Sequence, residues 1–225
     1  MPQRAAMTPE HGARLDTLAD LIATSPHNLV SSAERARVRT EHIPECWALG
    51  DTLAGLGISS GRWLDLGTGG GLPGLVLAMR LPAVQWVLVD ASAKKIDQVR
   101  AFADTLGLDN VRCHAGRAEV LARAEGWRAA FDGVIARALA PLRVLAELAR
   151  GFVAAQGWLA AVKGPGWEHE LAAAERAMAR CGWAEAHVHA VTSPVRSTWL
   201  VTMRAVGAPP QTVPRRDGVP HRRPL

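Results

Sequence analysis

The stretch W-L-D-L-G-T-G-G-G-L-P-G, residues Trp63 to Gly74, decides the fold of this chain. It begins with a short apolar run that carries one acid, Asp65, and such a run is typical of a buried strand in a parallel sheet. Four glycines follow within five positions, and glycine lets a backbone adopt positive φ and approach a ligand closely. Pro73 is typical of the first turn of a helix. The stretch therefore predicts a strand, a tight ligand-binding turn and the start of a helix.

Two kinds of ligand use such a glycine-rich turn. The spacing Gly69-x-Gly71-x-x-Gly74 matches the dinucleotide fingerprint, which is a weak signal on its own. The spacing Gly67-x-Gly69-x-Gly71, with Asp65 upstream, resembles the first motif of S-adenosylmethionine (SAM) methyltransferases. An acid at the strand end favours a ligand with an ammonium and a positive sulfur, whereas it repels a pyrophosphate. Asp65 therefore favours SAM, and a dinucleotide site or a turn without a ligand remain the alternatives.

The composition narrows the class of protein. The chain has 225 residues, of which 48% are hydrophobic, and this fits one α/β domain with additional segments. It contains no apolar run long enough for a membrane span and no signal-peptide stretch at its start. The three cysteines lie far apart, so neither disulfides nor a zinc site are expected. We expect a cytoplasmic monomer without metal or membrane contacts, and the net charge of +5 favours a polyanionic partner.

From residue 62 onward the sequence alternates between strand and helix patterns. Strands are expected at 62–66, 85–90, 110–114, 131–136 and 158–162, with helices that include 141–155 and 167–181. Two further alternating segments, 184–192 and 197–204, predict an antiparallel strand pair. The expected fold is therefore α/β and Rossmann-like, with a mostly parallel sheet, a C-terminal antiparallel strand pair and an N-terminal helical extension.

The segments on either side of this core carry many arginines. We expect residues 1–60 to form the helical extension, 61–205 the core, and 206–225 a basic tail rich in proline and arginine. In the extension, Arg35, Arg37 and Arg39 indicate either a solvated charged face or a surface that touches RNA phosphates. The tail is interpreted either as disordered or as an arm that packs back on the domain or binds RNA.

Polar residues follow the carboxyl ends of the expected strands, where ligands bind in this class of sheet. Asp90 follows the second strand and suits a hydrogen bond to ribose hydroxyls, or a helix cap. Ala118 and Glu119 follow the third strand and would frame an adenine, although Glu119 also suits the first turn of a helix. Arg137 and Lys163 follow the fourth and fifth strands, and Arg137 is expected to bind cofactor or substrate unless it forms a structural salt bridge.

Taken together, these motifs resemble the bacterial small-subunit ribosomal RNA guanine-N7 methyltransferases, once called glucose-inhibited division protein B. The resemblance covers nearly the whole chain, in N-L (28–29), L-D-L-G-T-G-G-G-L-P-G (64–74), L-V-D-A-S-A-K-K (88–95), G-R-A-E (116–119), A-R-A-L-A-P-L (136–142), V-K-G (162–164) and P-R-R-D-G-V-P-H-R-R-P-L (214–225). The chain departs from the family at Val30, where threonine is usual, and at 41–46, where an R-H and L-D-S element is usual. These departures affect the expected N-terminal RNA contacts rather than the cofactor site.

The resemblance implies a Rossmann-like class I enzyme that transfers a methyl group from SAM to N7 of one guanine of 16S ribosomal RNA, position 527 in the usual numbering. Its partner would be 16S rRNA or the small ribosomal subunit. The cofactor residues expected from the resemblance and the glycine spacing are Gly67, Gly69, Gly71, Leu72, Asp90, Ala118, Glu119 and Arg137. The residues expected to contact RNA are Lys163, Arg196, Arg215 and Arg216.

The expected chemistry needs no catalytic residue. Guanine N7 has an in-plane lone pair and carries no proton at neutral pH, so alignment of the reactants and exclusion of water are sufficient. Two rival functions remain open from the sequence. One is an NAD(P)-dependent oxidoreductase, supported by the dinucleotide fingerprint and Asp90, and the other is a non-enzymatic RNA-binding or assembly factor.

Overall fold

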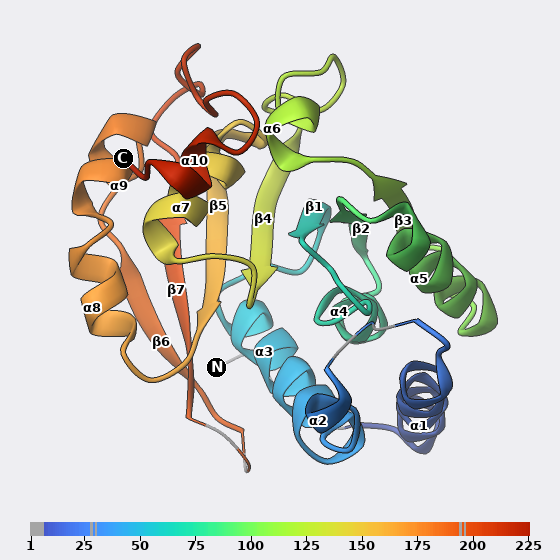
Figure 1. Ribbon diagram of the computed structural model, residues 1–225. Coiled ribbons are helices and arrows are strands. Elements are labelled where there is room, and N and C mark those ends of the chain that lie inside the picture. The colour runs from blue at the N-terminus through green and yellow to red at the C-terminus, as the bar shows by residue number, and fades with distance from the viewer. Residues whose placement is uncertain (1–6, 28, 30, 194, 196) are drawn as a thin grey trace.

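Seven strands form one mixed sheet in the order β3-β2-β1-β4-β5-β7-β6 (Figure 1). The five parallel strands are β1 (Gly61–Leu66), β2 (Val84–Asp90), β3 (Val111–Ala115), β4 (Phe131–Arg137) and β5 (Val153–Lys163). Strand β7 (Thr198–Arg204) runs antiparallel to β5, and β6 (His187–Val191) runs antiparallel to β7. The predicted α/β fold with a C-terminal antiparallel strand pair is therefore confirmed. This computed structural model describes residues 7–27, 29, 31–193, 195 and 197–225, so Asn28, Val30 and Arg196 lie outside the described residues.

Helices cover both faces of the sheet (Figure 1). On one side lie α1 (Pro9–Thr24), α2 (Ser32–Arg35), a π-helical turn η1 (Val38–His42), α3 (Ile43–Gly55), α4 (Gly74–Arg80) and α5 (Ala93–Thr105). On the other side lie α6 (Ala118–Leu121), α7 (Leu142–Arg150), α8 (Trp167–Ala172) and α9 (Glu175–Cys181), with α10 (Val219–Arg222) beside α7. Within the described part of the chain, none of the helices is long and apolar enough to cross a membrane.

The sheet buries most of its central strand β1, because helices pack on both faces. Trp63 and Leu64 of β1 point to opposite faces and are 1% and 0% exposed. Chain order reverses at β1, since β2 and β3 lie on one side of it and β4 and β5 on the other. Ligands bind at such a switch point, outside the carboxyl ends of the strands. The turn that follows β1 therefore lies where this fold places a ligand.

The N-terminal helices share a core with the sheet. Leu15, Leu18, Ala19 and Ile22 of α1 are buried, as their helical spacing predicts, and they belong to the same apolar cluster as Trp63. One core thus crosses the expected boundary at residue 60. The division into extension, core and tail stays a proposal.

The helix predicted at 141–155 is wrong over its last five residues. Helix α7 ends at Arg150, and β5 already begins at Val153. The run F-V-A-A-Q is apolar enough for either structure, and hydrogen bonds to β4 decide it, because the Phe131 N–H donates to the Phe152 carbonyl. The helix predicted at 167–181 is likewise two helices, α8 and α9. Glu170 of α8 accepts hydrogen bonds from the Leu142 N–H and the Lys163 ammonium, whereas α9 packs its apolar side on α7.

The tail packs back on the domain, so the disordered interpretation is wrong. The Arg128 guanidinium donates to the carbonyls of Pro209, Pro210 and Val213. The Val213 side chain is buried in the core cluster of the second face. The tail consequently brings α10 beside α7 (Figure 1).

Candidate functional site

The glycine turn after β1 adopts a backbone that other residues rarely adopt. Gly67, Gly69 and Gly71 have φ values of +77°, +56° and +91°. The N–H groups of Gly67 and Thr68 both donate to the Val89 carbonyl, at 2.8 and 2.9 Å, which fixes the turn against β2. A Cβ placed on Gly67 would lie 2.6 Å from a methyl carbon of Leu139. The turn is therefore a cradle that a side chain would fill.

Asp65 lies beneath this turn rather than facing a ligand. Its Oδ2 accepts hydrogen bonds from the Thr68 hydroxyl (2.7 Å) and the Gly74 N–H (3.0 Å), while its buried Oδ1 has no partner among the described residues. Burial raises the pKa of Asp65 to about 6, although the two hydrogen bonds oppose that rise. The acid that favoured SAM in the sequence thus holds the turn to the start of α4.

The L-P-G segment packs inward as well. Leu72 is 6% exposed and belongs to the first core cluster, and α4 begins at Gly74 directly after Pro73. A Cβ on Gly74 would lie 2.6 Å from Oδ2 of Asp65, so glycine is required for that hydrogen bond. The predicted cofactor contact of Leu72 stays a prediction.

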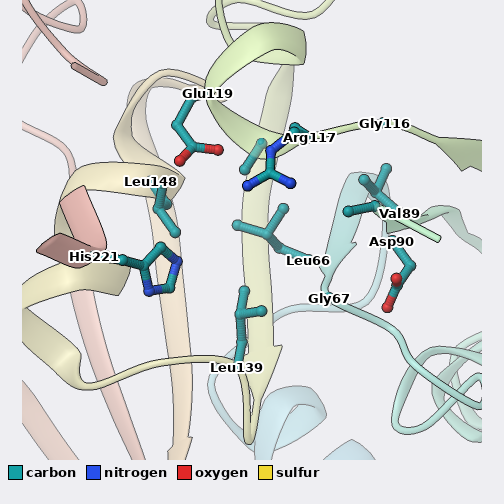
Figure 2. A pocket seen from close by; sticks show the side chains of 12 residues that line it. Leu66, Gly67, Val89, Asp90, Gly116, Arg117, Glu119, Leu139, Leu148 and His221 are labelled. Atoms are coloured by element: carbon teal, nitrogen blue, oxygen red, sulfur yellow. The ribbon is translucent and has the colours of Figure 1, made fainter. Parts of the chain in front are cut away.

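A cavity of about 160 Å³ opens beside the turn, at the carboxyl ends of β1 to β4 (Figure 2). Its lining is Leu66, Gly67, Val89, Asp90, Ala91, Gly116, Arg117, Ala118, Glu119, Leu139, Leu148 and His221. Four of the eight predicted cofactor residues, Gly67, Asp90, Ala118 and Glu119, line this one cavity. Gly69, Gly71, Leu72 and Arg137 do not line it, and their predicted contacts with the cofactor remain untested.

The two acids of the cavity are hydrogen-bonded by the backbone. Asp90 accepts from the Gly69 N–H at Oδ2 (3.1 Å) and from the Ser92 N–H at Oδ1 (2.9 Å). Each carboxylate oxygen has a second lone pair, so Asp90 retains acceptor capacity for ribose hydroxyls. Glu119 is 5% exposed and accepts from the Gly218 N–H of the tail at 2.9 Å. The glycine cradle and these acceptors fit the nucleoside part of SAM.

Arg137 and Lys163 line a second cavity, at the ends of β4 and β5 and the start of β7. Its lining is Glu45, Arg137, Ala138, Val162, Lys163, Gly164, Pro165, Ser197 and Thr198. The turn that begins at Ala138, with φ +53°, leads to Leu139 in the wall of the first cavity. The Lys163 ammonium donates to the Ala140 carbonyl (2.9 Å) and to Oε2 of Glu170 (2.7 Å). Arg137 therefore lines the second cavity and precedes Leu139, in the wall of the first, by two residues.

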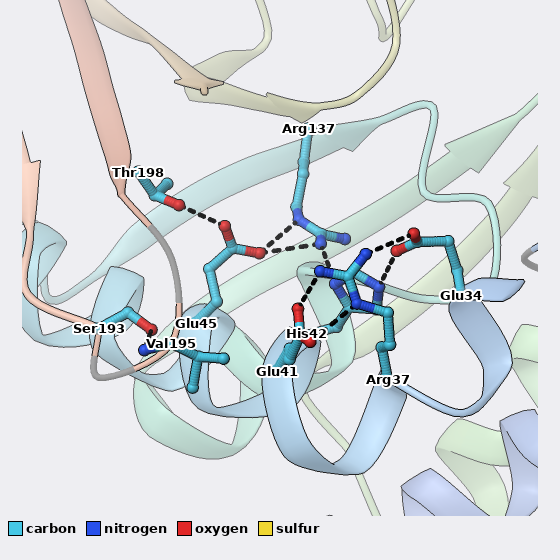
Figure 3. Close-up of polar contacts among 9 residues, drawn as sticks. All are labelled: Glu34, Arg37, Glu41, His42, Glu45, Arg137, Ser193, Val195 and Thr198. Carbon is cyan, nitrogen blue, oxygen red and sulfur yellow. Dashed lines mark hydrogen bonds and ion pairs between the residues drawn. The ribbon is translucent and has the colours of Figure 1, made fainter. Parts of the chain in front are cut away.

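Arg137 is held by a polar network that joins the N-terminal helices to the sheet (Figure 3). It donates to Oε2 of Glu45 at 2.8 and 3.2 Å and bonds Nδ1 of His42 at 2.7 Å. The other Glu45 oxygen accepts from the Thr198 hydroxyl, and Nε2 of His42 pairs with Glu34. Burial, and next the charge of Arg137, lower the pKa of His42. The salt-bridge alternative for Arg137 is thus what the structure contains.

The other predicted RNA contacts differ in their surroundings. Arg215 pairs with Glu147, a fully buried carboxylate of α7, at 2.6 Å. Arg216 is exposed and forms no ion pair with any described residue. Arg196 lies outside the described residues. The predicted RNA roles remain predictions, and Arg216 has the guanidinium that is most available to a phosphate.

Of the three arginines considered for RNA binding in the N-terminal helices, two are neutralised by neighbouring acids, whereas Arg35 donates to backbone carbonyls. Arg37 pairs with Glu34 and Glu41, and Arg39 pairs with Asp16 and Asp20. This favours the solvated charged face over an RNA-binding surface. Within the described ranges, no group of acids, histidines and cysteines is arranged to hold a metal ion.

Sequence reasoning missed several lining residues of the first cavity. Leu139 and Leu148 read as ordinary apolar residues of a loop and a helix, and Arg117 as a neighbour of Glu119. His221 lies in a tail without periodicity, and no local pattern points to its place. One indirect signal existed: Glu147 lies on the apolar side of α7, and a buried carboxylate needs a cationic partner.

The strand order, the glycine turn and the cavity beside it define a class I SAM-dependent methyltransferase. Among solved structures, a substituted form of MtNAS in complex with S-adenosylmethionine is 19% identical and has a TM-score of 0.61, with 86% of this chain and 72% of that chain covered. TrmN from Thermus thermophilus is 20% identical with a TM-score of 0.55, with 75% of this chain and 53% of that one covered. At these identities the likeness shows the fold.

Sequence relatives identify the family within that class. The family model described as rRNA small subunit methyltransferase G (GidB) matches residues 14–199. A protein named Ribosomal RNA small subunit methyltransferase G from Deinococcus deserti is 44% identical over 164 residues, 72% of this chain and 67% of its own. One of that name from Moorella thermoacetica is 33% identical over 201 residues, 88% of this chain and 82% of its own. The chain belongs to the rRNA small subunit methyltransferase G family, and its cofactor is S-adenosylmethionine.

Proposed function

We propose that this protein transfers the methyl group of SAM to N7 of a guanine in 16S ribosomal RNA, at position 527 in the usual numbering. The observation that carries the proposal is the presence of two cavities at the carboxyl edge of the sheet. The first has a glycine floor and acidic acceptors, and the second is lined by Arg137 and Lys163. A nucleoside fits the first and an RNA phosphate fits the second. The substrate would place the enzyme in the cytoplasm.

The first cavity would hold the cofactor through backbone and carboxylate groups. Gly67 allows close approach, Asp90 would accept hydrogen bonds from the ribose hydroxyls, and Ala118 and Glu119 would frame the adenine. When bound there, SAM supplies an electrophilic methyl group. Arg137, in the second cavity and two residues before Leu139 of the first, would position the methionine end of the cofactor or the acceptor base.

The chain needs no proton-transfer residue for this reaction. Guanine N7 presents a lone pair in the plane of its ring, so the protein has to align it with the methyl group and exclude water. The charged side chains of the second cavity are engaged with one another: Arg137 with Glu45, and Lys163 with Glu170. Their role in this proposal is to position the acceptor.

The second cavity would receive RNA by exchange of ion-pair partners. A phosphate that enters it competes with Glu45 and Glu170 for Arg137 and Lys163, and counterions leave the RNA as it binds. Binding should therefore weaken steeply as salt concentration rises. Arg216 at the edge of the tail would add a further phosphate contact.

Mass mapping of small-subunit rRNA from cells with and without the gene tests the proposal. We expect one guanine to lose a single methyl group in the deleted strain and to regain it when the wild-type gene is restored. Identical maps from the two strains would contradict the proposed reaction. They would favour the non-enzymatic RNA-binding or assembly factor instead.

A further inference from the structure

The C-terminal tail contributes a side chain to the cofactor cavity. Figure 2 shows His221 of α10 at the cavity, on the side opposite Asp90 and with Leu66 between them. The motifs that follow the strands assign no cofactor contact to this segment. We propose that His221 is a cofactor-contact residue and that the tail forms one wall of the site, against the adenosine end of SAM. This inference rests on the proposed function.

A buried ion pair fixes the beginning of this segment. Glu147 of α7 is fully buried, and its carboxylate accepts three hydrogen bonds from Arg215: from the backbone N–H (2.8 Å), from Nε (2.8 Å) and from Nη2 (2.6 Å). A buried carboxylate is costly unless it is paired and hydrogen-bonded. Arg215 is the cation that the structure gives it. This ion pair therefore stabilises the packing of the tail along α7.

A second contact holds the stretch before Arg215. The Arg128 guanidinium donates to three tail carbonyls, those of Pro209 (3.1 Å), Pro210 (2.8 Å) and Val213 (2.9 Å). Val213 itself is 4% exposed and packs in the core of this face. These contacts use the planar fork of arginine to satisfy backbone groups that have no strand or helix partner. The tail is anchored before it reaches the cavity.

The third set of contacts ties the tail to the cavity itself. Nε of Arg117 donates to Oδ1 of Asp217 at 2.6 Å, and the Gly218 N–H donates to Oε1 of Glu119 at 2.9 Å. Arg117 and Glu119 both line the cavity. Gly218 has φ +71° and begins the single turn of α10, which brings His221 to the cavity wall. The residues that would frame the adenine are thus held by the same segment that supplies His221.

The position of His221 indicates which end of SAM it would meet. Asp90, the acceptor suited to the ribose, lies on the opposite side, while Leu148 and Leu139 provide apolar surface on the side of His221. Glu119 lies above them in Figure 2. An imidazole beside apolar side chains offers a flat ring face to a purine and a ring nitrogen for a hydrogen bond. Those are the contacts that an adenine ring requires.

Titration calorimetry with full-length protein tests this inference. S-adenosylhomocysteine (SAH) and adenosine are titrated separately into the wild type and into His221→Ala. We expect the Kd of both ligands to rise about tenfold in His221→Ala, the effect of one lost ring contact. His221→Phe keeps a ring at this position and should retain most of the affinity. Gln211→Ala is the matched control, because its exposed side chain lies in the same tail and not in the cavity lining.

Three outcomes would contradict the inference, and they are distinguishable. An unchanged Kd for SAH in His221→Ala, with an unchanged unfolding temperature, would remove His221 from the site. A higher Kd for SAH with an unchanged Kd for adenosine would place His221 at the methionine end of the cofactor instead of the adenosine end. A wild-type protein that binds neither ligand would contradict the proposed function itself.

Discussion

The two cavities at the carboxyl edge of the sheet are built in opposite ways. The cofactor cavity is shaped by glycines and backbone groups, and Asp90 retains acceptor capacity there. In the second cavity, Arg137 and Lys163 are already paired with acids. The difference indicates that the site for the small ligand is preformed. The site for the polyanion, in contrast, holds its cations in internal ion pairs until a phosphate competes for them.

Removing Arg137 should give the largest effect, because it lines the second cavity and lies two residues from Leu139 in the wall of the first. We expect Arg137→Ala to lower the rate of methyl transfer at subsaturating SAM about 100-fold or more, the usual cost of lost alignment. The variant also leaves Glu45 buried without its cation, which should lower the free energy of unfolding by about 3–5 kcal/mol. Radiolabelled methyl transfer and denaturant unfolding measure the two effects.

The Arg137→Ala, Glu45→Ala double variant separates those effects. It removes the unpaired carboxylate, so it should recover much of the lost stability and none of the lost activity. Arg143→Ala, an exposed cation at the start of α7, is the control and should behave as the wild type. Near-wild-type transfer by Arg137→Ala at subsaturating SAM would contradict the role given to this residue.

Asp65 provides a pH-dependent test of the support beneath the cofactor cavity. Its pKa is about 6 in the fold, against an ordinary value of 3.8, so between these pH values the folded protein binds more protons than the unfolded chain. The stabilisation that this raised pKa gives the fold is fully present below pH 3.8 and is lost as pH rises through 6. The free energy of unfolding of Asp65→Asn relative to wild type should therefore increase by roughly 2 kcal/mol between pH 4 and pH 7, because Asn does not titrate. A difference that does not vary with pH would show that the carboxyl group is charged in the fold throughout.

Gly67→Ala tests the cradle with a smaller expected effect. The added methyl would lie 2.6 Å from Leu139 in the cavity wall, and we expect the Kd for SAH to rise about 10- to 100-fold, from strain and lost space together. Gly57→Ala is the matched control, since Gly57 also has a positive φ (+81°) but no atom within 4 Å of the added carbon. Equal affinities for SAH in the two variants would mean that Gly67 is a turn residue alone.

The smallest expected effect concerns RNA phosphate contacts. Arg216→Ala should reduce the slope of log K against log salt for rRNA binding by about 1, the value for one phosphate contact. Arg37→Ala should leave the slope unchanged, because Arg37 is paired with Glu34 and Glu41. Filter binding over a salt series measures both. An unchanged slope for Arg216→Ala and a reduced slope for Arg37→Ala would indicate that the N-terminal helices, and not the tail, contact RNA.

The features that the sequence predicts correctly are those that depend on residues close to one another in the chain. The β/α alternation and the C-terminal strand pair follow from periodicity, and Gly67, Asp90 and Glu119 reach one cavity because parallel strands align their carboxyl ends. The end of α7 was mispredicted because an apolar run suits helix and strand alike.

Long-range side-chain contacts could not be predicted. Arg215 and Glu147 are 68 residues apart, and nothing local distinguishes Arg215 from the exposed Arg216 next to it. The same holds for His221, whose place at the cavity follows from that ion pair and from the bond between Gly218 and Glu119. The network around Arg137 likewise depends on Glu45, which lies 92 residues away in the chain.

Titration of SAH and of NADH into the purified wild-type protein, without RNA, tests whether the cofactor cavity is a preformed SAM site. A preformed SAM site predicts binding of one SAH per chain and no binding of NADH. Binding of NADH alone would contradict the methyltransferase assignment and favour the dinucleotide alternative. Binding of SAH only after rRNA is added would contradict the preformed cofactor cavity.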